Sequence, residues 1–319
     1  MKFLVTPTSF CKPENRAARE RLEAYAGQVA YNDLGVPLRG EALLARLAGA
    51  DAYIAGLDYI DKAAVEGMPP SLKVISRYGA GVDRIDLAAC RKRGIVVTNT
   101  PGANATAVCE LAFGLLLSVA RHIPRLNEQV RQGGWPRENG LELCGRTLGI
   151  LGLGAIGKLV AARAKAFGME VVAYDPYLDR AFAEKEGVAP VTLEALLQRA
   201  DVVSLHLPLN VQTRNILNAQ RIAALKPGAI LINASRGGLL DEAVAAQALA
   251  QGRLWGIGLD AFAEEPPADS PLKGLPNVVL TPHTGAHTAE AVARMGLQAV
   301  ENAIQVLEGQ SCPYIVTDA

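Results

Sequence analysis

Three polar side chains that follow apolar runs are the residues in this sequence best suited to chemistry. Arg236 follows the run AILINAS, Glu265 lies in DAFAEEPP after the run WGIGL, and His283 follows NVVLTP. In an open parallel sheet the carboxyl ends of the strands share one edge, where ligands bind. A guanidinium there can bind a carboxylate through two hydrogen bonds. An imidazole with a carboxylate behind it can give and take a proton, because the carboxylate orients the ring and favours its charged form.

A second stretch, TLGILGLGAIG, indicates a nucleotide-binding turn. An apolar run leads into Gly152, Gly154 and Gly157 in the spacing G-x-G-x-x-G, and a helical run follows. The first glycine permits the tight turn, the second lets the backbone approach a pyrophosphate, and the third lets helix and strand pack closely. The free N–H groups at the helix start, at Ala155 and Ile156, favour a bound anion.

An acidic residue after the next apolar run indicates which nucleotide binds. Asp175 lies 18 residues after Gly157, at the end of EVVAYDP. A carboxylate there can accept hydrogen bonds from both ribose hydroxyls of NAD, whereas it repels the 2′-phosphate of NADP. We therefore predict NAD as the cofactor. Strand, turn, helix, second strand and acid in this order are far more specific than a lone glycine motif.

Together these groups suit hydride transfer to a 2-keto acid. The reaction needs a fixed cation for the substrate carboxylate, a proton donor for the carbonyl oxygen and a source of hydride. Arg236 can supply the first, His283 with its carboxylate partner the second, and NADH the third. In the oxidation these roles reverse, and a neutral His283 takes the hydroxyl proton.

Alternating apolar and helical runs predict the elements that carry these residues. Between residues 101 and 284, six apolar runs alternate with helical runs, which predicts a doubly wound parallel sheet of six strands. Within this unit, Asn104–Arg121 is predicted to be a long helix that is apolar on more than one stripe. Such a helix must be covered on both sides, so we expect it either at a subunit interface or buried between two domains.

The first 100 residues predict another unit of the same class. Five short apolar runs alternate with helical runs, and they contain no G-x-G-x-x-G. The final helical run, Ala289–Glu308, is too long for a further crossover, and we expect it to pack back on this first unit. The predicted fold is therefore α/β with two doubly wound parallel-sheet domains. A nucleotide-binding domain over residues 101–284 is inserted into a substrate domain made of residues 1–100 and 285–319.

The overall composition narrows the class of partner. The 319 residues contain 32 Lys and Arg and 32 Asp and Glu, so the chain has no electrostatic footprint for nucleic acid or for an anionic membrane. The longest apolar stretch, Leu111–Ala120, is about half of the ~20 residues that a membrane span needs. Five scattered cysteines without a C-x-x-C pair are expected to be buried, reduced thiols of a cytoplasmic protein, and we predict no metal site.

Six motifs occur together in the order found in one known family. RYGAGVDRIDL, NTPGANATAVCE, GLGAIG, NASRGG, LDAFAEEPP and LTPHTG resemble those of the D-isomer-specific 2-hydroxyacid dehydrogenases, particularly the branch of phosphoglycerate dehydrogenases and hydroxypyruvate/glyoxylate reductases. The resemblance runs from about residue 72 to 288. It is consistent with a Rossmann domain inserted into a flavodoxin-like substrate domain. Because the glycine loop and the Arg–Glu–His set lie in different predicted domains, we expect the active site in the cleft between them. From the long apolar helix we expect a homodimer formed through the nucleotide-binding domain.

The resemblance also implies a role for each residue that matches a motif. Arg236 corresponds to the substrate arginine, Glu265 to the acid and His283 to the acid/base. The backbone N–H groups of a glycine loop bind the substrate carboxylate, and Arg77 beside this loop suits a phosphate or a second anionic group. The loop is Gly79, Ala80 and Gly81. Asp260 is expected near the nicotinamide, and the residues assigned to the cofactor are Gly152, Gly154, Ala155, Ile156, Gly157, Asp175, His206, Pro208, Ala234 and Asp260.

Four further residues need an interpretation from the sequence. His206 either lines the cofactor site or is a structural histidine. His287 either binds a substrate phosphate or, as we favour, caps the last helix. We expect His122 at the surface, and Trp135 in core or interface packing, although it could instead reach a partner's active site.

Two classes of function are compatible with these features. The first is an NAD-dependent dehydrogenase acting on D-3-phosphoglycerate, hydroxypyruvate or glyoxylate. The second is an NAD(H)-sensing binding protein similar to a corepressor of the same fold, with little or no turnover. The sequence ends soon after its last predicted helix, so we expect neither the tails of such a corepressor nor an appended regulatory domain.

Overall fold

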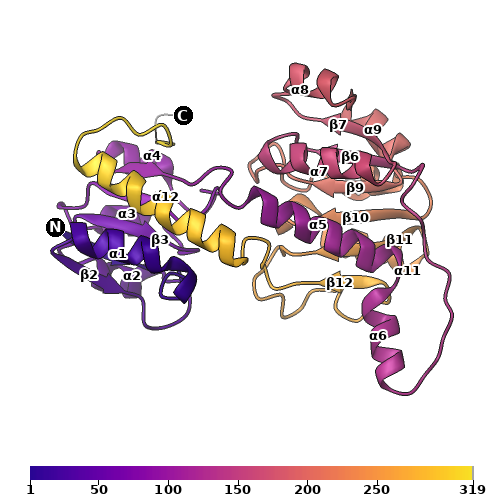
Figure 1. Cartoon of the computed structure of the whole chain (residues 1–319), viewed down its shortest axis with the longest axis horizontal. Helices are drawn as coiled ribbons and strands as arrows, with labels where there is room; N and C mark the ends of the chain where they lie inside the picture. The colour runs from indigo at the N-terminus through magenta and orange to yellow at the C-terminus, as the bar shows by residue number, and fades with distance from the viewer. Residues whose placement is uncertain (318–319) are drawn as a thin grey trace. The chain divides into compact units, whose positions relative to one another are not determined.

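The computed structural model describes residues 1–317 and divides the chain into two compact units (Figure 1). The first unit is Met1–Asn104 together with the chain from Ala286 onward, and the second is Ala105–Gly285. Each unit contains one parallel sheet with helices on both faces, which confirms the predicted α/β class. Residues 318 and 319, which the predicted substrate domain includes, lie outside the described residues.

The first unit has a five-stranded sheet in the order β2-β1-β3-β4-β5. This is the strand order of flavodoxin-like folds, as predicted. Its strands are β1 (Lys2–Val5), β2 (Gln28–Tyr31), β3 (Ala52–Ala55), β4 (Val74–Arg77) and β5 (Val96–Thr98). Because side chains alternate between the faces of a strand, Phe3 and Val5 enter one core while Leu4 enters the other.

Helices of the first unit cover both faces of this sheet. On one face lie α1 (Arg16–Tyr25), which follows the short η1 (Pro13–Asn15), and the last helix α12 (Ala289–Leu307). On the other lie α2 (Gly40–Leu47), α3 (Lys62–Gly67) and α4 (Leu87–Lys92). The packing of α12 against β3, β4 and α1 brings the end of the chain onto the first sheet, as the length of the helical run predicts.

The second unit has a seven-stranded sheet in the order β12-β11-β10-β9-β6-β7-β8. Its strands are β6 (Thr147–Leu151), β7 (Glu170–Tyr174), β8 (Ala189–Pro190), β9 (Val202–Leu205), β10 (Ala229–Asn233), β11 (Leu254–Leu259) and β12 (Val278–Leu280). The predicted count of six is therefore wrong by one. The missed strand, β8, has only two residues and lies at the sheet edge beside β7, so it is too short to produce an apolar pattern.

Helices α5 (Ala105–Ala120) and α7 (Ala155–Ala166) cover one face of this sheet (Figure 1). The opposite core includes α9 (Leu193–Arg199), α10 (Ala219–Ala223) and α11 (Glu242–Ala250), while α8 (Arg180–Lys185) precedes β8. Helix α5 packs on β10, β11 and α7, and this contact within its own unit accounts for its apolar stripes. Gly258 in β11 permits the approach, because a Cβ there would lie 2.9 Å from Cβ of Leu115.

Helix α6 (Ile123–Arg131) was not expected from the sequence. It follows α5 after a bend of 62°, and a long segment after it leads to β6 (Figure 1). No single helix among residues 1–317 is long and apolar enough to cross a membrane. The bent pair α5 and α6 together has the length and the apolar composition of a span, but α5 is a largely buried core helix.

Two surface expectations are wrong. His122, at the bend before α6, is 8% exposed rather than at the surface. Its Nδ1 lies 2.8 Å from Oδ1 of Asn277, and its ring stacks on Trp255 at 5.2 Å. The cysteines are not all buried either, since Cys11 and Cys144 are exposed.

Candidate active site

The glycine turn after β6 has the geometry that its spacing predicts. Gly152 has φ of 99°, and a Cβ there would lie 2.7 Å from the carbonyl of His206. A Cβ on Gly157 would lie 2.1 Å from the carbonyl oxygen of Gly152. Both positions therefore require glycine. A Cβ on Gly154 would meet no atom of the described chain within 4 Å, so the space in front of this residue is open to a ligand.

The start of α7 and the end of β7 complete this turn. Gly154 is the N-cap of α7 and provides no side-chain cap, so the first N–H groups of the helix, at Ala155 and Ile156, can bind an anion. Asp175 is held at the turn because its two oxygens accept the N–H groups of Leu153 and Tyr177, each at 2.7 Å. Each oxygen has a further lone pair for a hydroxyl group. This donor and acceptor set fits a pyrophosphate followed by a ribose.

Other predicted cofactor residues lie at the ends of neighbouring strands of the same sheet. His206 follows β9, which pairs with β6 on one side and β10 on the other, and Ala234 follows β10. Nε2 of His206 lies 2.8 Å from the hydroxyl of Ser204, while its Nδ1 is buried without a partner among residues 1–317. Desolvation lowers the pKa of His206 from 6.5 to about 4, so the ring is neutral near pH 7. Pro208 lies further along the same loop and is exposed.

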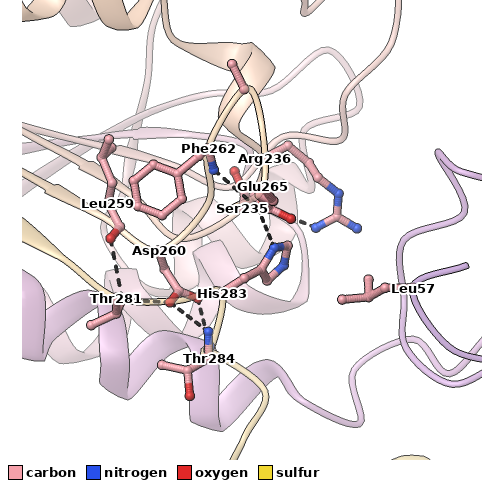
Figure 2. Close-up of polar contacts among 12 residues, drawn as sticks. Leu57, Ser235, Arg236, Leu259, Asp260, Phe262, Glu265, Thr281, His283 and Thr284 are labelled. Carbon is pink, nitrogen blue, oxygen red and sulfur yellow. Dashed lines mark hydrogen bonds and ion pairs between the residues drawn. The ribbon is translucent and has the colours of Figure 1, made fainter. Parts of the chain in front are cut away.

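Glu265 and His283 form a direct pair. Nδ1 of His283 lies 2.7 Å from Oε1 of Glu265, and Figure 2 shows the ring turned toward this carboxylate. The same oxygen accepts the N–H of Phe262 at 3.3 Å. His283 has φ of 50°, a left-handed conformation that is uncommon for a residue with a Cβ. The surrounding turn must therefore hold it.

Asp260 holds this turn. Its carboxylate is 1% exposed and accepts three hydrogen bonds, from the hydroxyl of Thr281 at 2.6 Å and from the N–H groups of Thr284 and Gly285 at 2.8 and 2.7 Å. Figure 2 shows the bonds from Thr281 and Thr284, which lie on either side of His283 in the chain. Asp260 thus fixes the backbone that carries the imidazole of His283. The sequence predicts only that Asp260 lies near the nicotinamide, so this structural role is additional.

Arg236 follows β10, beside the strand β11 that leads to Glu265. Asn233 shapes the turn: its Nδ2 donates to the carbonyl of Arg236 at 2.8 Å, and its Oδ1 accepts the N–H of Ser235 at 3.1 Å. Nη1 of Arg236 donates to the carbonyl of Ser235 at 2.8 Å. A Cβ on Gly237 would lie 1.8 Å from the carbonyl carbon of Phe262, so only glycine lets this turn pass the loop that carries Glu265. Since β10, β11 and β12 are adjacent and parallel, the three predicted catalytic side chains share one sheet edge.

The predicted substrate loop belongs to the first unit and follows β4. Gly79 has φ of 137°. The guanidinium of Arg77, 9% exposed, donates from Nε to the carbonyl of Gly81 at 3.1 Å and from Nη1 to the carbonyl of Tyr78. Arg77 is therefore engaged with its own loop, and a contact with a substrate anion stays a prediction.

Several supporting residues were not foreseen. Asn233, Gly237 and Thr281 shape the turns of the second unit, and Asn99 donates to the carbonyl of Ala80 at 2.7 Å in the first. Asn233 and Gly237 lie within the motif NASRGG, and Asn99 begins NTPGANATAVCE, so the motifs marked these positions without indicating what they contact.

Two other expectations have a different outcome. The N-cap of α12 is Thr288, whose hydroxyl accepts the N–H of Ala291 at 3.1 Å, so the expectation that His287 caps this helix is wrong. Trp135 is 76% exposed, which excludes packing in the core of this chain.

The fold and the turn define a protein that binds a dinucleotide, and comparison with known proteins gives its family. Residues 113–285 match the model for "D-isomer specific 2-hydroxyacid dehydrogenase, NAD binding domain". A D-3-phosphoglycerate dehydrogenase of Methanocaldococcus jannaschii is 42% identical over 91% of this chain. The chain spans 56% of the length of that protein. A hydroxypyruvate reductase of Thermotoga maritima is 45% identical over 74% of this chain and 78% of its own.

Solved structures agree with this assignment over the whole chain. A protein of Thermus thermophilus is 41% identical, with a TM-score of 0.87 over 99% of this chain and 100% of that one. D-lactate dehydrogenase of Aquifex aeolicus, in complex with NAD and lactic acid, is 28% identical, with a TM-score of 0.84 over 96% of each chain. The chain belongs to the D-isomer-specific 2-hydroxyacid dehydrogenase family, and the part matched by the family model is the NAD-binding domain.

Proposed function

We propose that this protein is an NAD-dependent D-2-hydroxyacid dehydrogenase that reduces small 2-keto acids, most favourably hydroxypyruvate, glyoxylate or the keto acid of D-3-phosphoglycerate. The observation that carries the proposal is the 2.7 Å pair of His283 and Glu265. It lies on the sheet edge that also carries Arg236 and the glycine turn. The names of the relatives from M. jannaschii and T. maritima support the phosphorylated acid and hydroxypyruvate, and a glyoxylate reductase structure that is 28% identical supports glyoxylate.

The second unit has the groups needed to hold the cofactor. The open space at Gly154 and the N–H groups of Ala155 and Ile156 would hold the pyrophosphate, and Asp175 would accept the ribose hydroxyls. When bound, NAD(H) supplies or takes the hydride. The first unit would act as the substrate domain through its loop at Gly79–Gly81.

His283 moves the proton. With Nδ1–H directed at Glu265, a neutral ring has its lone pair on Nε2 and the charged ring has a proton there. In the reduction, Nε2 of the charged ring donates this proton to the carbonyl oxygen, and the negative Glu265 stabilises that charged ring beforehand. In the oxidation, Nε2 of the neutral ring accepts the hydroxyl proton. Arg236 binds the substrate carboxylate and so fixes C2 relative to Nε2.

We also infer a homodimer through the second unit. None of the nine residues of α6 is buried within the described chain, although its sequence is amphipathic. Ile123 and Val130 on this helix are 50% and 49% exposed, and Trp135 beyond it is 76% exposed. Exposed apolar side chains that follow one another along a helix with no buried residue are typical of an interface, and the partner that we propose is a second copy of this chain.

The experiment that tests the reaction measures NADH consumption by the purified protein with hydroxypyruvate, glyoxylate, pyruvate and phosphohydroxypyruvate. We expect kcat/KM to be measurable for at least one of hydroxypyruvate, glyoxylate and phosphohydroxypyruvate. The product is the D-hydroxy acid wherever C2 becomes a stereocentre, whereas glyoxylate gives achiral glycolate. If NADH binds but no acid in the panel is reduced, the dehydrogenase proposal fails. An NADH-dependent protein partner would then favour the corepressor-like alternative.

A further inference from the structure

The loop between β4 and residue 82 is held by hydrogen bonds to four consecutive carbonyl groups. The carbonyls of Tyr78 and Gly81 accept from the guanidinium of Arg77. The carbonyl of Gly79 accepts the N–H of Thr100 at 3.0 Å, and that of Ala80 accepts Nδ2 of Asn99 at 2.7 Å. All four oxygens are therefore directed at the body of the first unit.

The orientation of these carbonyls fixes that of the N–H groups between them. In a trans peptide the C=O of one residue and the N–H of the next point in opposite directions. Because the carbonyls of residues 79, 80 and 81 face inward, the N–H groups of Ala80, Gly81 and Val82 face outward. Within the described part of the chain these three N–H groups have no acceptor. Successive outward N–H groups form a concave binding site for an anion.

Arg77 lies directly behind this row of N–H groups. A Cβ on Gly79 would lie 2.9 Å from Nη1 of Arg77, so the guanidinium packs closely against the loop, and the φ of 137° at Gly79 favours glycine there. Arg77 provides donors to two of the four carbonyls, and its fixed positive charge adds to the attraction of the loop for an anion in front of it. Asn99, directly after β5, provides a third side-chain donor to the loop.

We propose that Arg77 and Asn99 are positioning residues that hold the loop in its anion-binding form, and that Arg77 does not itself bind a second anionic group of the substrate. This inference rests on the proposed function, in which the first unit binds the anionic substrate through this loop. It has a definite consequence: loss of the guanidinium weakens the binding of every 2-keto acid by the same factor, whether or not the acid has a phosphate.

The kinetic test compares the wild type with Arg77→Met and Arg77→Lys. We expect Arg77→Met to raise KM for hydroxypyruvate and for phosphohydroxypyruvate by the same factor, roughly tenfold to a hundredfold, as loss of charge-assisted hydrogen bonds predicts. KM for NADH should change little, and Arg77→Lys should restore part of the loss. A much larger loss with the phosphorylated acid would show that Arg77 binds phosphate and overturn the proposal. Unchanged KM values would overturn it too. If the wild type does not reduce the phosphorylated acid, the test uses hydroxypyruvate alone: a raised KM in Arg77→Met supports the proposal and an unchanged KM overturns it.

Two further variants separate positioning from general loss of stability. Arg93→Met is the matched control, because Arg93 also donates to backbone carbonyls of the first unit, those of Val65 and Met68. We expect it to lower Tm without changing KM. If Arg77→Met does not fold, Asn99→Ser removes a single donor to the loop, and it should raise KM in the same direction by a smaller factor. An unchanged KM in Asn99→Ser would contradict the role of Asn99.

A measurement without substrate distinguishes failure of this inference from failure of the proposed function. The N–H of Thr100 donates to the carbonyl of Gly79, so its hydrogen exchange reports whether the loop is held. We expect exchange at Thr100 to be faster in Arg77→Met and unchanged in Arg93→Met. Suppose that the wild type reduces no keto acid but that exchange at Thr100 is faster in Arg77→Met than in the wild type. The proposed function then fails, whereas the positioning role of Arg77 is supported. Unchanged exchange would overturn the positioning role.

Discussion

Glu265 and His283 come from the loops after two adjacent strands, β11 and β12, and act as one unit. Glu265→Gln removes the negative charge of this pair but keeps its hydrogen bond, because the amide oxygen can still accept from Nδ1–H of His283. We expect kcat for keto acid reduction to fall roughly tenfold to a hundredfold, because the charged ring is no longer stabilised. Steady-state kinetics with saturating NADH measure this change.

The neighbouring acid provides the control. Glu264 is exposed and is adjacent to Glu265 in the chain, so Glu264→Gln removes the same charge without touching the imidazole. We expect its kcat to match the wild type. Equal losses in the two variants would indicate a general effect of charge and contradict the assigned pair.

A second residue-scale prediction concerns stability and pH. Burial lowers the pKa of His206 from 6.5 to about 4, so between these values the unfolded chain binds a proton that the folded chain does not. Stability from this residue is therefore present above pH 6.5 and lost as pH falls toward 4, by at most about 3 kcal/mol. The free energy of unfolding of the wild type should thus decrease more steeply over this range than that of His206→Gln. Parallel pH profiles in urea denaturation would contradict the prediction.

At the scale of elements, glycine is needed for different reasons at two positions of one turn. Gly157 is needed by the fold, because its Cβ would lie 2.1 Å from the carbonyl oxygen of Gly152, whereas Gly154 faces open space. We expect Gly157→Ala to lower the stability of the protein by about 1–3 kcal/mol through overpacking. Gly154→Ala should leave Tm unchanged and weaken NADH binding roughly tenfold or more, because the methyl group occupies the approach of the pyrophosphate. Thermal unfolding and NADH titration measure the two effects.

Gly274→Ala serves as the reference for these variants. A Cβ at Gly274 also meets no atom of residues 1–317 within 4 Å, but the residue lies outside the glycine turn. We expect neither Tm nor NADH affinity to change. Unaltered NADH binding in Gly154→Ala would remove the assignment of the open space to the cofactor.

Elements with strong periodicity could be predicted from the sequence, and weakly patterned ones could not. The five strands of the first unit and six of the second are recognisable as apolar runs, whereas β8 is too short to form one. Helix α6 had recognisable signals, with Pro124 in its first turn and Ile123, Leu126 and Val130 at helical spacing. It was missed because the long apolar pattern of α5 ends at Arg121 and the next run is short and mostly polar.

Individual contacts were less predictable than the residue types. The motifs identify Arg236, Glu265 and His283, and the strand order then brings them to one edge. They do not reveal that Arg77 donates to the carbonyls of its own loop, because a backbone acceptor leaves no pattern in side-chain types. The burial of His122 depends on Asn277, which is 155 residues away in the chain and has no sequence signal of its own.

At the scale of the whole molecule, the exposed side of α6 predicts the oligomeric state. Aspartate at both Ile123 and Val130 places two charges where the proposed interface is apolar, which should convert the dimer to a monomer. Analytical ultracentrifugation measures the change. Val211→Asp is the matched control, since Val211 is 95% exposed in the same unit and is not part of α6. A wild type that sediments as a monomer, or a double variant that remains a dimer, would contradict the proposed interface.

The most direct test of the proposed reaction is His283→Asn, measured for both turnover and NADH binding. Asparagine keeps a polar side chain near Glu265 but cannot transfer a proton. We predict that kcat for hydroxypyruvate or glyoxylate falls by roughly 10² to 10⁴, while the Kd for NADH changes less than about threefold. Turnover equal to that of the wild type, with NADH still bound, would contradict His283 as the acid/base and with it the central claim.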